Sequence, residues 1–133
     1  MASIFTKIVN GDIPAYKVAE TEDFLAFLDI RPRVKGHTLC IPKTEVDYLF
    51  DLDDGRYIGL QIFAREVARA LEKTVPCKRI ATAVLGLEVP HAHIHLLPIN
   101  SMQEFGFHIP PIEITSEEME TLAANIRANV ALG

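Results

Sequence analysis

The run from Pro90 to Pro98 constrains the fold of this chain more than any other segment, because it places a histidine at every second position. A β-strand points successive side chains to opposite faces, so His91, His93 and His95 are expected on one face and the apolar residues between them on the other. One strand histidine is usually a packing or surface residue, but three in strict alternation gather titratable rings. The pattern predicts a strand over 91–97 with a reactive face and a core face.

The rest of the chain predicts an α+β fold. Short apolar runs bounded by polar, Gly or Pro residues predict further strands, at 16–20, 24–29, 37–41 and 78–85. Apolar residues at three-and-four spacing predict a helix from Asp53 or Asp54 to Thr74, and the capping-box pair Thr115 and Glu118 predicts a second helix at the C-terminal end. We expect a single domain, residues 1–133, in which an antiparallel sheet carries helices mainly on one face.

Composition and charge exclude several classes of function. The 13 Lys and Arg residues are scattered and outnumbered by 18 Asp and Glu, giving a net charge of −5; nucleic-acid binders concentrate basic residues, so no nucleic-acid partner is expected. No apolar stretch approaches the roughly 20 residues of a membrane span, and no secretory signal is visible. We expect a cytoplasmic protein with no membrane partner. Cys40 and Cys77 form no C-x-x-C pair and are interpreted as small buried hydrophobic residues.

Two kinds of chemistry use a face of alternating histidines. In the first, the rings bind a metal such as zinc, with His37 or His108 as a further ligand. In the second, one neutral imidazole attacks a phosphorus atom while its neighbours donate hydrogen bonds to the phosphoryl oxygens. Only Glu88 offers a carboxylate near the cluster, which favours phosphoryl chemistry. A metal-dependent hydrolase with the three strand histidines as ligands stays open as the alternative.

The segment from His91 to Leu97 resembles the signature of the histidine triad (HIT) superfamily, His-φ-His-φ-His-φ-φ with φ apolar, at every position. Four segments nearer the N-terminus resemble the nucleotide-binding branch of that superfamily, at 3–9, 11–15, 25–30 and 36–43. The likeness covers most of residues 1–98 and is less clear over the last 35 residues.

The resemblance implies a role for each matching residue. His93 would be the nucleophile that attacks the α-phosphate of a nucleotide conjugate and becomes transiently nucleotidylated, while His91, His95 and His37 would surround the phosphate. Asp29 would accept hydrogen bonds from the ribose hydroxyls. The residues that match the apolar walls of the base pocket are Ile4, Phe5, Ile8, Phe27 and Ile30.

The resemblance also implies a substrate class and an assembly. We expect a homodimeric hydrolase of purine nucleotide conjugates, with adenosine or guanosine phosphoramidates as the leading substrates and with no metal or other cofactor. A nucleotide-binding protein that keeps the histidine face but has lost turnover is the non-catalytic alternative.

The loop from Gly86 to Pro90 departs from the family pattern, because Leu87 and Glu88 stand where many members have an amide and a hydroxyl. Glu88 is a candidate leaving-group contact: protonated it would serve as a general acid, and ionised it would favour a cationic amine. A solvent-facing loop glutamate explains it equally well. His108 is expected at the surface or in packing, and the aromatic segment around it is a candidate contact with the partner subunit's site.

Overall fold

A computed structural model describes residues 2–132 of the chain, and in that range five strands form one sheet in the order β1-β2-β3-β5-β4, with antiparallel neighbours throughout. The strands are β1 (Lys17–Glu20), β2 (Phe24–Leu28), β3 (Thr38–Pro42), β4 (Arg79–Ala83) and β5 (Ile94–Ile99). The helices are α1 (Ile4–Val9), α2 (Asp54–Thr74) and α3 (Ser116–Asn129), with short 3-10 turns η1 (Leu49–Asp51) and η2 (Met102–Glu104).

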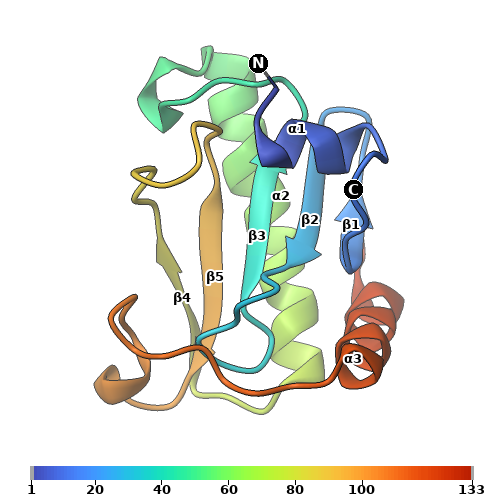
Figure 1. Cartoon of the computed structure of the whole chain (residues 1–133), viewed down its shortest axis with the longest axis vertical. Coiled ribbons are helices and arrows are strands. Elements are labelled where there is room, and N and C mark those ends of the chain that lie inside the picture. The colour runs from blue at the N-terminus through green and yellow to red at the C-terminus, as the bar shows by residue number, and fades with distance from the viewer. Residues whose placement is uncertain (1, 133) are drawn as a thin grey trace.

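The helices divide unequally between the two faces of the sheet. The long α2 and the C-terminal α3 lie on one face, and the short α1 lies across the other, over β2 and β3 (Figure 1). Ala92, Ile94 and Leu96 belong to the apolar core under α2 and α3. Phe5 and Ile8 of α1 pack in a second apolar cluster on the opposite face. The predicted α+β fold, with helices mainly on one face, is confirmed.

Both predicted helices begin at the residues that their capping signals indicate. Asp53 accepts a hydrogen bond from the Arg56 N–H, 2.7 Å away, at the start of α2. Thr115 and Glu118 form the expected capping box at the start of α3, each side chain accepting from the other's backbone N–H. These bonds satisfy amides that would otherwise lack a partner. Over residues 2–132, no helix combines the length and apolar character that crossing a membrane requires.

Two elements differ from the prediction. The helix α1 was not expected, because six residues are too few to display a helical period; its start is fixed by Ser3, whose side chain accepts the Thr6 N–H. The last strand begins at Ile94 instead of 91, because the Ala92 N–H donates to the carbonyl of Val46, which lies in a loop outside the sheet.

Gly36 lets the chain turn tightly into β3 just before the buried His37. Its φ is +88°, a conformation that L-residues with a side chain rarely adopt. A Cβ atom at this position would also lie 3.1 Å from side-chain atoms of both Pro98 and Val75. The position therefore combines a backbone constraint with a packing constraint.

We expect Gly36→Ala to lower the free energy of unfolding by about 2–4 kcal/mol, since it adds crowding to the strain of a positive φ. Gly11→Ala is the matched control: its φ is +82° but nothing lies within 4 Å of the added Cβ, so it should lose only about 1–2 kcal/mol. Urea unfolding of both variants measures the difference. Equal losses would show that the contacts with Pro98 and Val75 contribute nothing.

Candidate active site

Four of the five histidines are buried together at the face of the sheet that α1 covers. His37 precedes β3, His91 and His93 precede β5, and His95 lies within β5 opposite Leu39. Their exposed fractions are 1%, 0%, 7% and 8% in that order. A buried imidazole needs hydrogen-bond partners, because an unpaired polar group in the interior costs roughly 1–3 kcal/mol. The partners of each ring therefore indicate where its protons lie.

The ring of His93 uses one nitrogen to hold its orientation. Its Nδ1 lies 2.7 Å from the carbonyl oxygen of His91, and since a carbonyl only accepts, Nδ1 carries the proton. In the neutral ring Nε2 then keeps its lone pair. Among the described residues, no hydrogen bond reaches Nε2. Phe5 and His95 flank the ring edge to face, with centroids 5.0 Å and 4.9 Å away.

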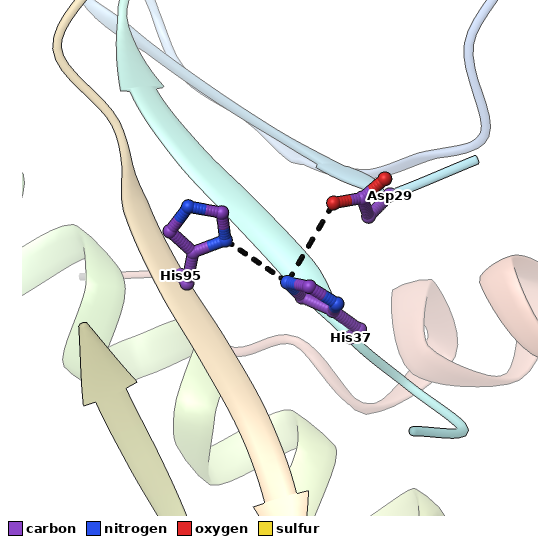
Figure 2. Close-up of side chains that lie close together, drawn as sticks. All are labelled: Asp29, His37 and His95. Atoms are coloured by element: carbon purple, nitrogen blue, oxygen red, sulfur yellow. Dashed lines mark hydrogen bonds and ion pairs between the residues drawn. The ribbon is translucent and has the colours of Figure 1, made fainter. Parts of the chain in front are cut away.

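His37 and His95 are joined by a hydrogen bond between their rings, and its donor and acceptor can be assigned (Figure 2). The Arg33 backbone N–H donates to His37 Nδ1 at 3.1 Å, so the proton of neutral His37 lies on Nε2. That Nε2 lies 2.9 Å from His95 Nδ1 and donates to it. The proton of neutral His95 is consequently on its own Nε2. One backbone amide thus sets the tautomers of two rings in sequence.

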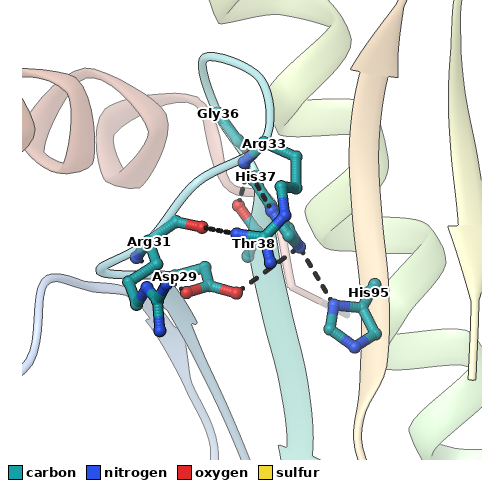
Figure 3. Close-up of polar contacts among 7 residues, drawn as sticks. All are labelled: Asp29, Arg31, Arg33, Gly36, His37, Thr38 and His95. Atoms are coloured by element: carbon teal, nitrogen blue, oxygen red, sulfur yellow. Dashed lines mark hydrogen bonds and ion pairs between the residues drawn. The ribbon is translucent and has the colours of Figure 1, made fainter. Parts of the chain in front are cut away.

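Asp29 lies next to this pair because one more hydrogen bond of the β2–β3 pairing forms just beyond the ends of the two strands. The Asp29 N–H donates to the His37 carbonyl at 2.9 Å, and Asp29 Oδ2 lies 3.6 Å from His37 Nε2. The other oxygen, Oδ1, accepts the Arg31 N–H at 2.9 Å. Figure 3 shows the Arg33 side chain alongside, where its Nη1 donates to the Arg31 carbonyl at 2.8 Å.

Burial keeps the histidines of this pair neutral. It lowers the pKa of His37 from its usual 6.5 to about 4, although the Asp29 carboxylate acts in the opposite direction. Burial first, and then the electrostatic effect of the neighbouring His93, His37 and Arg33, lower the pKa of His95 to about 3. At neutral pH both rings are hydrogen-bond donors without charge.

His91, which the resemblance implies beside the phosphate, has protein groups next to both of its ring nitrogens. Its Nε2 donates to the Pro42 carbonyl at 2.7 Å, and its Nδ1 lies 2.8 Å from Ser3 Oγ. Both ring nitrogens are therefore used inside the protein, and the residue has no exposed surface. Burial also lowers the pKa of His91. The ring is held between α1 and the end of β3.

The residues expected at the base pocket fall into two groups. Phe5, Ile8 and Phe27 are buried in the cluster beneath α1, where the rings of Phe5 and Phe27 meet edge to face at 5.5 Å. Ile4 and Ile30 are 47% and 72% exposed. A binding site for a planar apolar ligand needs both kinds of residue: buried apolar side chains beneath the ligand and exposed ones at its edge.

Glu88 lies exposed in the loop between β4 and β5, and its neighbour Leu87 is 92% exposed. His108 is also exposed, as expected. The aromatic segment beside His108, however, packs within this chain: the Phe107 ring lies 4.6 Å from that of His95 and 6.1 Å from that of His37. No pattern in the sequence indicates this contact, because an aromatic residue in a loop has no periodic partner.

A group of possible metal ligands gathers at this site, but it differs from the set predicted. The ligand atoms of Asp29, His37 and His95 lie within 4.8 Å of one another. For His37 Nε2 to coordinate, its proton would have to move to Nδ1, which the Arg33 N–H already faces at 3.1 Å. Two donors would then oppose each other. The hydrogen bonding therefore favours proton donation over coordination by His37.

Comparisons with known proteins agree with the resemblance. The family model for the HIT domain matches residues 10–102, a range that contains all four buried histidines. A Schizosaccharomyces pombe protein named adenosine 5′-monophosphoramidase is 34% identical over 133 residues, covering 98% of this chain and 99% of its own.

Solved structures give the same match. A Hit-like protein of Bartonella henselae, described as involved in cell-cycle regulation, superposes with a TM-score of 0.83 at 29% identity over 96% of both chains. A zinc-bound histidine triad family protein of Mycobacterium smegmatis gives a TM-score of 0.83 at 30% identity, over 97% of this chain and 93% of its own.

The lowered pKa values predict how stability depends on pH. As pH falls below 6.5, the unfolded chain binds protons that buried His37 and His95 do not, so the free energy of unfolding decreases. The contribution of His37 ends near pH 4 and that of His95 near pH 3, where each ring takes up its proton in the fold. His37→Gln should reduce this slope by up to about 1.4 kcal/mol per pH unit. Urea unfolding between pH 4 and 7 measures the slope, with His108→Gln, at an exposed position, as the control. An unchanged slope in His37→Gln would contradict the assignment.

Proposed function

Because the chain belongs to the histidine triad family, we propose that it is a hydrolase that cleaves purine nucleoside 5′-phosphoramidates at the α-phosphate, through a covalent intermediate on His93. The observation that carries the proposal is the hydrogen bond from His93 Nδ1 to the His91 carbonyl. It orients the ring and leaves the lone pair of Nε2 for attack. The name of the S. pombe relative supports the phosphoramidate class.

The reaction runs in two displacements. In the first, the Nε2 lone pair of His93 forms a bond to the α-phosphorus, and the P–N bond to the leaving amine breaks as the amine keeps its electron pair and takes a proton from solvent water. In the second, a water oxygen attacks the same phosphorus and releases a proton to solvent, the bond to Nε2 breaks with its electron pair returning to the ring, and the nucleoside monophosphate leaves with His93 restored. The proton stays on His93 Nδ1, hydrogen-bonded to the His91 carbonyl, throughout.

His95 is the proposed donor to the phosphoryl group. Its Nε2 carries the proton because Nδ1 accepts from His37, and it stands beside His93 on the same face. A donor of this kind typically contributes 100- to 1,000-fold in rate, about 3–4 kcal/mol. His37 acts through His95 by fixing its tautomer. His91, with both nitrogens engaged, is assigned to positioning instead of to phosphate contact.

The nucleoside side of the site is proposed around Asp29. A carboxylate can accept from two ribose hydroxyls, and Asp29 Oδ2 faces the histidine pair while Oδ1 is anchored by Arg31. Exposed Ile4 and Ile30, together with the apolar floor that includes Phe5, Ile8 and Phe27, would hold the purine. Exposed Glu88, in the loop between β4 and β5, would favour an amine leaving group that carries positive charge.

Release of AMP from adenosine 5′-phosphoramidate tests the mechanism, in wild type and in His93→Ala, each with and without EDTA. We expect turnover that EDTA leaves unchanged and that falls by at least roughly 1,000-fold in His93→Ala, since the nucleophile is lost. Exposed His108→Ala is the control and should keep wild-type turnover. Turnover abolished by EDTA would indicate the metal-dependent hydrolase, and tight AMP binding without turnover would indicate the non-catalytic alternative.

We also propose that the protein is a homodimer in the cytoplasm. β4 is an edge strand of the sheet, and a groove lined by α2 and β4 runs beside it. Ile58 and Ile62, one turn apart on α2, are 56% and 44% exposed. A free strand edge next to exposed apolar side chains is a surface that a second copy would cover.

Sedimentation equilibrium tests the dimer. We expect twice the mass of one chain for wild type and a shift toward the monomer for Ile62→Glu, because a buried unpaired carboxylate would disfavour association. Ile112→Glu is the matched control, since Ile112 is 37% exposed on the segment before α3, away from β4. A monomeric wild type at micromolar concentration would refute the assembly.

A further inference from the structure

A hydrogen-bonded chain runs from Glu45, on the surface, to the ring of His91. Glu45 Oε1 accepts the Ser3 backbone N–H at 2.6 Å and the Thr6 hydroxyl at 2.6 Å. These two donors hold the pKa of Glu45 well below its usual range. Glu45 is therefore a carboxylate that only accepts, and both the N-cap residue Ser3 and Thr6 of α1 donate to it.

Ser3, which Glu45 holds through its backbone N–H, contacts His91 through its hydroxyl group. Its hydroxyl oxygen accepts the Thr6 N–H at 3.1 Å and lies 2.8 Å from His91 Nδ1. The Pro42 carbonyl requires a proton on His91 Nε2, so in the neutral ring Nδ1 accepts and the Ser3 hydroxyl donates. Thr6 Oγ1, whose own proton goes to Glu45, lies 3.3 Å from the same Nδ1.

The segment that carries Glu45 also holds the peptide group that orients the nucleophile. The Ala92 N–H donates to the Val46 carbonyl at 2.7 Å. The carbonyl of that same peptide group belongs to His91 and accepts from His93 Nδ1 at 2.7 Å. Hydrogen bonds on both sides of one amide polarise it and strengthen each other. Residues 42–46 thus hold His91 in three ways. The Pro42 carbonyl binds its ring, Glu45 holds Ser3, which contacts the ring, and the Val46 carbonyl binds the peptide group between His91 and Ala92.

We propose that Glu45 is a positioning residue for the His93 nucleophile, acting through Ser3 and Thr6 on His91. This inference rests on the proposed function, since it presumes that His93 reacts. Without the Glu45 carboxylate, the Ser3 backbone N–H and the Thr6 hydroxyl lose their acceptor, and these two bonds no longer tie the N-terminal end of α1 to the segment after β3. The ring of His91 then loses its fixed donor, and the carbonyl that directs His93 shifts with it.

The test compares Glu45→Ala, Glu45→Gln and Asp53→Ala. In Glu45→Ala we expect kcat for adenosine 5′-phosphoramidate to fall on the order of 10-fold, because small misplacements of reacting groups cost large factors in rate. We also expect the 15N NMR signals of His91 and His93 to lose their single-tautomer values. Glu45→Gln keeps an acceptor oxygen for Ser3 and Thr6 and should restore most of both properties.

Asp53→Ala is the matched control for stability, because Asp53 is likewise an exposed carboxylate at a helix start, on α2. It should unfold more easily than wild type but keep the wild-type kcat and histidine signals. Equal losses of kcat in Asp53→Ala and Glu45→Ala would overturn the proposal, as would a Glu45→Ala variant with unchanged kcat. Should wild type prove to have no turnover, the proposed function fails on its own, and the 15N signals still decide whether Glu45 sets the histidine tautomers: unchanged signals in Glu45→Ala overturn the link.

Discussion

The pairing of β3 with β5 is the interaction on which the site depends. The two strands are separated in sequence by α2 and β4, yet Leu39 lies opposite His95 in the ladder. The register of this pairing determines which residues meet beyond each end of the ladder, and so where the four histidines lie relative to one another. Beyond one end of the ladder, His37 reaches His95. Beyond the other end, the segment that follows β3 meets His91 and the residues around it. A shift of one residue would turn every ring toward the opposite face.

Burial of four imidazoles in one place is the second constraint. Each ring loses its contact with water and has to recover hydrogen bonds inside the protein. For three of the four rings the partner that fixes the tautomer is a main-chain group: the Arg33 amide for His37, the Pro42 carbonyl for His91 and the His91 carbonyl for His93. Because these groups either donate or accept and never both, they fix which nitrogen carries the proton. The tautomer of His95 is set indirectly, through the ring of His37. Desolvation then keeps His37 and His95 uncharged.

Sequence patterns predicted the parts of this arrangement that repeat along the chain. Alternation identified the two faces around His91–His95, and capping residues identified the starts of α2 and α3. The short α1 was missed because one turn and a half has no period to detect. The partner of His37 Nδ1 was also beyond prediction, since every residue has a backbone amide and only the turn before Gly36 aims this one at the ring. Phe107 reaches His95 through a loop, whose path no local pattern encodes.

Main-chain groups determine which nitrogen of these rings carries the proton, and this affects how such a protein can evolve. A side chain that directs a catalytic ring can be lost by one substitution, whereas a carbonyl or amide persists through any substitution that preserves the backbone path. The loop before the triad, in which Leu85, Leu87 and Glu88 are exposed, is separate from those main-chain partners. On the leaving-group role proposed for Glu88, mutations there would alter which leaving group is accepted while the reacting ring keeps its protonation. Selectivity and reactivity would then be free to evolve on separate parts of the chain.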